Sequence, residues 1–145
     1  MSFAELDIHP SLRRAIDDLG FTEPTPIQRS ALPPALAGRD VLGCAMTGSG
    51  KTAAFALPIL QRLGGGSGAS RALVLTPTRE LAAQVHEHIE ALGVHTRIRS
   101  TAVFGGVKQG PQERALRSGT DIVVATPGRL LDLMQQNIAR FDRLE

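Results

Sequence analysis

The sequence predicts an α/β domain with a mostly parallel sheet flanked by helices. From residue 40 onward, short apolar runs alternate with longer segments of helical periodicity, an alternation typical of α/β folds. Two runs, at 72–75 and 122–125, are apolar throughout, as expected for strands buried on both faces of a parallel sheet. The length of 145 residues suits a single domain with one core.

We expect residues 1–39 to form a mostly helical segment packed on a second part, residues 40–145, within this one domain. The first helix carries Leu12, Ile16 and Leu19 on one stripe and ends at Gly20. The predicted strands are 41–45, 72–76, 100–104 and 122–126, and the helices between them include 52–63, kinked at Pro58, and 81–92. A Gly-rich stretch at 64–68 is expected to be a flexible loop without function.

Composition excludes several classes of protein. No apolar run approaches the roughly 18 residues of a membrane span, and the acidic start, MSFAELDIHP, does not resemble a secretory signal. The single cysteine, Cys44, excludes an internal disulfide, is expected to be buried, and favours a reducing, cytoplasmic location. With five Phe, no Trp and no Tyr, any nucleic acid is expected to be held by its backbone rather than by base stacking.

The sequence AMTGSGKT at 45–52 has the spacing of a phosphate-binding loop, although it opens on Ala instead of Gly. Gly48 and Gly50 would let backbone N–H groups converge on phosphate oxygens at a helix N-terminus. Lys51 would supply a positive charge to the β- and γ-phosphates, and the Thr52 hydroxyl would reach Mg²⁺. The sequence therefore predicts a nucleotide site here, with no other metal site.

Two alternatives apply to this loop. A Gly-rich turn without a ligand is disfavoured by its context, an apolar strand before it and a helix after it. The dinucleotide fingerprint also matches residues 48–53, but it requires an acidic residue at the end of the second strand to hold a ribose hydroxyl. That strand ends in Thr76-Pro77 instead, so the dehydrogenase interpretation fails.

Two strand ends share one layout, in which an apolar strand is followed by Thr-Pro and then by an Arg two residues later. These are residues 73–79 and 123–129. Helix capping explains the Thr and the Pro but not Arg79 and Arg129, because an Arg at a helix N-terminus opposes the helix dipole. A bound anion would resolve this conflict, and parallel strands would bring both junctions to the sheet edge that carries the phosphate loop. We therefore favour a nucleic-acid backbone beside a nucleotide, with ordinary capping as the alternative.

Together these motifs resemble the first RecA-like domain of the DEAD-box RNA helicases, and the resemblance covers essentially the whole chain. The matching segments are 20–28 for the Q motif, 45–52 for motif I, 77–82 for motif Ia, 105–106 for the GG motif and 126–129 for motif Ib. Five motifs in the family's order are far more specific than any one of them.

The resemblance implies ATP or ADP with Mg²⁺ as cofactors, and single-stranded or duplex RNA bound through its sugar–phosphate backbone. Gln28 would read adenine, since a carboxamide matches N7 and the N6 amino group, and Phe21 would lie against the ring unless it belongs to the core. The implied nucleotide site is Phe21, Thr25, Gln28, Thr47, Gly48, Ser49, Gly50, Lys51 and Thr52. The implied RNA site is Pro77, Thr78, Arg79, Gly105, Gly106, Thr126, Pro127, Gly128 and Arg129.

The chain also departs from the family's pattern. Met46 stands where many members carry Gln, a change expected to be harmless. The catalytic Asp-Glu-Ala-Asp would follow the point where this chain stops, at 143–145, and the Ser-Ala-Thr motif and the second RecA-like domain with its arginine fingers are also missing. The sheet is thus expected to be incomplete at the C-terminal truncation.

These departures lead us to expect nucleotide binding by these residues without appreciable hydrolysis or unwinding, because phosphoryl transfer relies on the missing carboxylates and arginines. The parent protein would be an ATP-dependent RNA helicase. A non-enzymatic nucleotide-binding module and a related DNA helicase, which would lack the Q motif, are the alternatives.

Overall fold

The computed structural model describes all residues, 1–145, and divides them into two compact units. Unit 1 consists of residues 1–64 and 91–97, and unit 2 of residues 65–90 and 98–145. None of the helices combines the length and the apolar character needed to cross a membrane. The predicted single domain, with its division after residue 39, stays a prediction.

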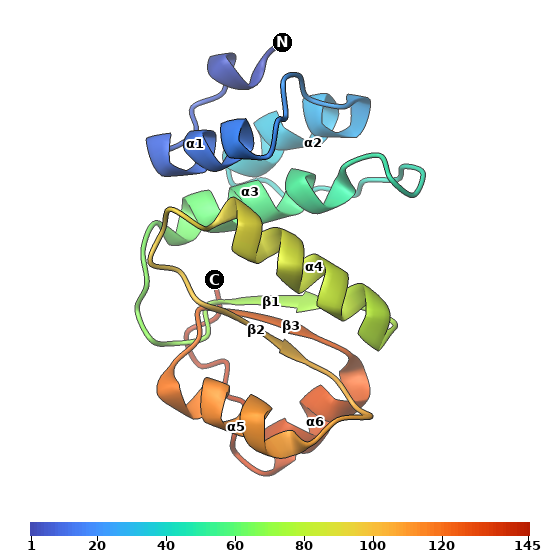
Figure 1. Ribbon diagram of the computed structural model, residues 1–145, viewed down its shortest axis with the longest axis vertical. Coiled ribbons are helices and arrows are strands. Elements are labelled where there is room, and N and C mark those ends of the chain that lie inside the picture. The colour runs from blue at the N-terminus through green and yellow to red at the C-terminus, as the bar shows by residue number, and fades with distance from the viewer. The chain divides into compact units, whose positions relative to one another are not determined.

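Unit 1 is helical (Figure 1). Its elements are the 3-10 helix η1 (Phe3–Glu5), α1 (Pro10–Asp18), α2 (Pro26–Leu36) and α3 (Lys51–Leu63). Leu12 and Ile16 are each 1% exposed, so the predicted apolar stripe of α1 is confirmed there. The third position, Leu19, is 41% exposed; α1 ends one residue earlier, and the left-handed Gly20 follows, which removes Leu19 from the helical face.

The strand predicted at 41–45 is wrong. This segment forms no strand, and Leu42 is 97% exposed. An extended segment is stabilised by pairing with neighbouring strands, and the sheet consists of three other strands only. Cys44 lies in this unpaired segment and is exposed as a free thiol, so its predicted burial is wrong for the same reason.

Unit 2 contains the sheet, with β1 (Ala72–Leu75), β2 (Ser100–Val103) and β3 (Ile122–Ala125) in the order β1-β3-β2, all parallel. Its helices are α4 (Arg79–Leu92), whose last two residues belong to unit 1, α5 (Gln109–Ser118) and α6 (Pro127–Gln135). Figure 1 shows α4 over one face of the sheet and α5 and α6 over the other. The α/β prediction is confirmed, and three of the four predicted strands are present, each one residue shorter than expected.

Burial differs between the two apolar strands. All four residues of β3, the central strand, are 0% exposed, which confirms burial on both faces. β1 lies at the sheet edge and is only partly buried, and Leu75 is 57% exposed, so the same prediction is wrong there. On the face covered by α6, Val123 and Val103 pack in one cluster with Leu130 and Leu133.

A buried carboxylate ties the loops at the amino ends of the strands together. Asp121 is 1% exposed and accepts hydrogen bonds from the backbone N–H groups of Ser67 (2.8 Å) and Arg99 (2.9 Å). Its carboxylate also forms an ion pair with the Arg71 guanidinium at 3.0 Å. Burial raises the pKa of Asp121, but the backbone bonds from Arg99 and Ser67 and the Arg71 guanidinium together outweigh it, so the pKa lies below its usual value. The Gly-rich segment at 64–68 is a loop, as predicted, and is bonded to Asp121 at Ser67; its flexibility stays a prediction.

Candidate nucleotide and nucleic-acid sites

The predicted phosphate loop lies in unit 1 and leads directly into α3, which begins at Lys51. Gly48 and Gly50 have φ values of +80° and +84°, a left-handed conformation that glycine adopts at little cost. The first N–H groups of α3 have no partner within the helix, and a helix terminus of this kind is able to bind an anion. Lys51 is exposed and donates from Nζ to the carbonyl of Ala45 at 2.6 Å. This hydrogen bond joins the end of the loop to its first residue.

Gln28 connects the segment that resembles the Q motif to this loop. It lies in α2, is 3% exposed, and accepts a hydrogen bond at Oε1 from the Thr25 backbone N–H (3.0 Å). Its Nε2 donates to the Gly50 carbonyl, also at 3.0 Å. A carboxamide has two N–H donors and two acceptor lone pairs, so one donor and one acceptor of Gln28 are left by these two bonds.

One buried hydroxyl group of the loop, Ser49 Oγ, has no hydrogen-bond partner, whereas the Thr25 hydroxyl faces the backbone N–H of Gln28 in a capping box. An unsatisfied buried hydroxyl is costly, and a phosphate oxygen would satisfy Ser49 Oγ, so the residues present fit a nucleotide. Phe21 is 40% exposed, which excludes the alternative of a core position. No group of three or more His, Cys, Asp and Glu side chains is arranged to hold a metal ion.

The predicted RNA residues lie in unit 2, at the carboxyl edge of the sheet. The parallel register pairs both Leu75 and Val103 with Ala125, and the Thr76 N–H continues the ladder to the Ala125 carbonyl at 2.9 Å. The Thr126 N–H likewise donates to the Val103 carbonyl at 3.0 Å. The residues after all three strands thus emerge at one edge, as predicted. The further expectation that the phosphate loop shares this edge stays a prediction.

The two Thr-Pro junctions differ in structure, although their sequences match. α6 begins at Pro127 with Thr126 as the N-cap residue, without a side-chain cap. α4 instead begins at Arg79, and the Thr78 hydroxyl caps it by accepting the Leu81 N–H at 3.2 Å. Helix capping therefore does not explain Thr76 and Pro77 at α4, because this helix is capped by Thr78, the Thr after the Pro.

Arg79 is the first residue of α4 and pairs through Nε with the Glu80 carboxylate at 3.0 Å. The pKa of Glu80 is lowered first by its own backbone N–H and then by Arg79. A carboxylate in the first turn offsets the unfavourable charge of an Arg there. The guanidinium lies directly against Gly106, at the position where a Cβ would stand, so motif Ia and the GG motif are in contact.

Arg129 contacts the same loop at Val107. Its guanidinium donates to the Val107 carbonyl at 2.9 Å and to Gln112 Oε1 at 3.1 Å, and Gln112 Nε2 donates to the Phe104 carbonyl at 3.0 Å. Arg79 and Arg129 thus have partners within the chain, and no anion is needed to explain either. Gln112 was missed from the sequence because nothing distinguishes it from the other polar residues of α5; its burial, 7% exposed, is visible only in the structure.

Comparison with known proteins agrees with this arrangement. The family model described as DEAD/DEAH box helicase matches residues 25–145. Among curated relatives, DEAD-box ATP-dependent RNA helicase 28 of Oryza sativa subsp. japonica is 53% identical over 141 residues, which are 95% of this chain and 18% of the relative. ATP-dependent rRNA helicase RRP3 of Eremothecium gossypii is 51% identical over 134 residues, 92% of this chain and 28% of that protein.

Solved structures show the same similarity. The crystal structure of a DEAD box protein from the hyperthermophile Methanococcus jannaschii has a TM-score of 0.91 and 36% identity, and covers 100% of this chain and 40% of its own. A hypothetical ATP-dependent RNA helicase from Sulfolobus tokodaii has a TM-score of 0.82 and 42% identity, and covers 91% and 38%. The fold is RecA-like, and the chain spans less than half the length of each of these relatives. The chain belongs to the DEAD/DEAH box helicase family.

Proposed function

We propose that this chain is the ATP-binding and RNA-backbone-binding part of an ATP-dependent RNA helicase. The observation that carries the proposal is the hydrogen bond from Gln28 to Gly50, which joins the candidate adenine-reading residue to the candidate phosphate loop. The family supplies the nucleotide dependence, since the relatives named above are ATP-dependent RNA helicases.

The nucleotide would be held from both ends. The remaining donor and acceptor of Gln28 suit the adenine edge, while Phe21 offers an exposed ring. At the other end, Lys51 would exchange the Ala45 carbonyl for phosphate oxygens, beside the backbone N–H groups of the loop. The Thr52 hydroxyl would hold Mg²⁺. When bound, MgATP supplies the phosphoryl group whose hydrolysis drives the parent enzyme.

RNA would be bound along the carboxyl edge of the sheet through its sugar–phosphate backbone. The exposed residues there include Pro77, Thr78, Gly106 and Gly128, which present small side chains and turn backbone. Contacts of this kind carry no sequence information, in keeping with a chain that has neither Trp nor Tyr. A DNA helicase remains the alternative substrate class, and discrimination between the two would rest on the RNA 2′-hydroxyl.

We further propose that these 145 residues bind nucleotide without appreciable turnover. No strand in unit 2 ends in an acidic pair, since β1, β2 and β3 are followed by Thr76, Phe104 and Thr126. The catalytic carboxylates and the arginine fingers would come from other parts of the parent, including a second RecA-like domain. Arginine fingers alone raise the rate of hydrolysis by about 10³–10⁵. The exposed free thiol of Cys44 supports a reducing, cytoplasmic location.

The test is a nucleotide titration combined with a phosphate-release assay, each with and without oligouridine. We expect saturable ATP and ADP binding, weak binding of GTP, and no RNA-stimulated phosphate release. RNA-stimulated turnover by the 145 residues would contradict the proposed inactivity. The absence of nucleotide binding would overturn the proposal as a whole.

A further inference from the structure

We propose that Gln112 is a positioning residue for the RNA site, one that holds the loop at 104–108 and the start of α6 in a single geometry. The inference rests on the proposed function, because it concerns the same edge of the sheet. It assigns a role to a residue that no motif includes.

Gln112 is bonded to both parts of the candidate site. Its Nε2 donates to the carbonyl of Phe104, the residue that follows β2, and its Oε1 accepts from Arg129 near the start of α6. Arg129 in turn donates to the Val107 carbonyl. One buried carboxamide and one guanidinium therefore fix both ends of the turn that contains Gly105 and Gly106.

The turn itself is poorly held by other means. Residues 106–108 are exposed, and Gly106 has a left-handed φ of +82°, a conformation that glycine adopts at little steric cost. Loops with few buried apolar contacts open at low free-energy cost. Besides the contact of Arg79 with Gly106, this backbone is held by the hydrogen bonds from Gln112 and Arg129, and an ordered loop binds a backbone ligand with less entropy loss.

Gln112 cannot act by contact with RNA, since its side chain is buried and uncharged. Its effect must pass through the Phe104 carbonyl and Arg129. A positioning role predicts weaker RNA binding with no loss of phosphate contacts, whereas a purely structural role predicts lower stability with unchanged RNA affinity. The two roles can therefore be separated by experiment.

The experiment compares Gln112→Met with Gln109→Met on the same helix. Methionine retains the length and the apolar stem but removes both hydrogen bonds, so that packing changes little. Gln109 directly follows the loop, but its side chain bonds to Glu113 and Gln136 and to no residue of 104–108, so it is the matched control. Each variant is titrated with fluorescent oligouridine over a series of salt concentrations and with ATP, and amide hydrogen exchange is followed across residues 104–108.

For Gln112→Met we expect RNA affinity about tenfold lower, an unchanged dependence of affinity on salt, unchanged ATP affinity, and faster exchange in the loop. Gln109→Met should match the wild type in all four. Wild-type RNA affinity in a folded Gln112→Met, or an equal loss in both variants, would overturn the proposal. Binding of ATP but not of oligouridine by the wild-type chain would contradict the proposed RNA site. In that case, unchanged hydrogen exchange at 104–108 in Gln112→Met would overturn the positioning role on its own.

Discussion

The side-chain amide of Gln28 donates a hydrogen bond to the backbone carbonyl of Gly50 at 3.0 Å, across 22 residues of sequence. Gly50 is the N-cap residue of α3 and stands in the left-handed region. The same side chain accepts the N–H of Thr25, at the start of α2. The positions of Gly50 in the phosphate loop and of the Gln28 side chain therefore depend on each other. The first two predictions concern this hydrogen bond.

Gln28→Ala should lower ATP affinity at least tenfold and remove the preference for ATP over GTP. The variant loses the adenine-reading group and also leaves the partly buried Thr25 N–H and Gly50 carbonyl unpaired, each at a cost of up to about 1–3 kcal/mol. Parallel titrations with ATP and GTP check this. Gln61→Ala is the control, since Gln61 also bonds two backbone groups of unit 1, the His9 N–H and the Asp7 carbonyl. Equal, unaltered binding of both nucleotides by Gln28→Ala would show that Gln28 does not read the base.

Gly50→Ala should be more damaging than Gly48→Ala, although both residues have left-handed φ values. At Gly48 an added Cβ meets nothing within 4 Å, so only the conformational strain applies, about 1–2 kcal/mol. At Gly50 the Cβ would collide with Nε2 of Gln28 and displace it. Thermal unfolding and ATP titration of the two variants measure the difference. Identical losses would mean that the contact with Gln28 contributes nothing.

Lys51→Ala should abolish measurable nucleotide binding while stability changes little. The Lys51 side chain is exposed, and its bond to the Ala45 carbonyl lies at the surface, where such interactions contribute little to the free energy of unfolding. Lys108→Ala removes the other lysine of the chain, also exposed but in unit 2, and should bind ATP normally. Isothermal titration provides the measurement, and wild-type affinity in Lys51→Ala would rule out the phosphate-loop assignment.

Asp121→Asn should remove much of the acid sensitivity of unit 2. Because the pKa of folded Asp121 is lowered, its ionised form stabilises the fold fully above its unfolded pKa, about 4, and that stabilisation is lost as pH falls through the folded pKa. At neutral pH the variant should be less stable by about 2 kcal/mol, since it loses charge-assisted bonds. Denaturant unfolding at a series of pH values checks both effects.

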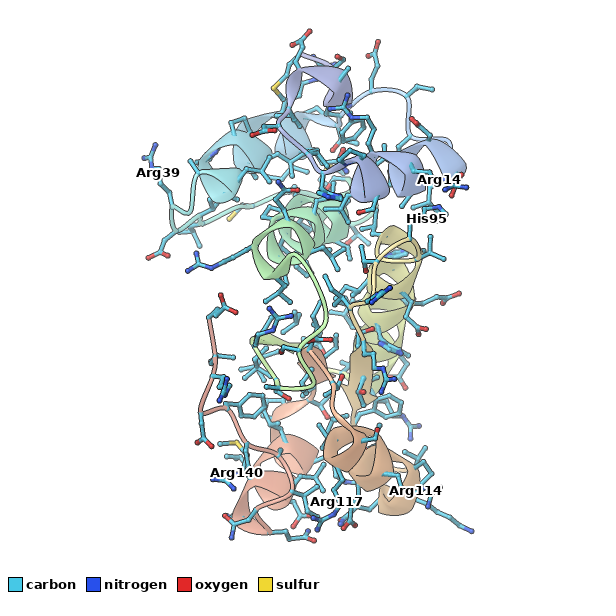
Figure 2. All side chains as sticks on the ribbon, turned by 90° about the vertical axis from the view of Figure 1, so that its left-hand side faces the viewer. Arg14, Arg39, His95, Arg114, Arg117 and Arg140 are labelled. Atoms are coloured by element: carbon cyan, nitrogen blue, oxygen red, sulfur yellow. The ribbon has the colours of Figure 1, made fainter.

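The control for this prediction is Asp142→Asn, which breaks the exposed ion pair with Arg140 and should leave stability within about 1 kcal/mol of the wild type. Figure 2 labels Arg140 among the side chains that project outward from unit 2, with Arg114 and Arg117 of α5. A wild-type acid profile in Asp121→Asn would show that the buried carboxylate does not govern the pH dependence.

Several features could be predicted from the sequence because they depend on local patterns. The continuous apolar run at 122–125 predicted a buried strand, and β3 is that strand. The glycine spacing of AMTGSGKT predicted a turn into a helix, and Gly48 and Gly50 have the left-handed angles that such a turn requires. Chain direction in a parallel sheet placed the three junctions at one edge. The first two follow from the residues of one segment, and the third follows from the βαβ alternation, which predicts parallel strands.

The tertiary structure alone decided the rest, because pairing and burial depend on partners distant in sequence. Residues 41–45 have the composition of a strand but find no neighbour to share backbone hydrogen bonds, and so Leu42 and Cys44 are exposed. The similar runs of β1 and β3 differ in burial because one is an edge strand and the other is central. Gln112 looks like any other glutamine in the sequence, and Gln28 is singled out only by the resemblance of residues 20–28 to the Q motif. Their contacts are visible only in the folded chain. There the Gln28 amide bonds to Gly50 of the phosphate loop, and the Gln112 amide bonds to Phe104 and Arg129 of the candidate RNA site.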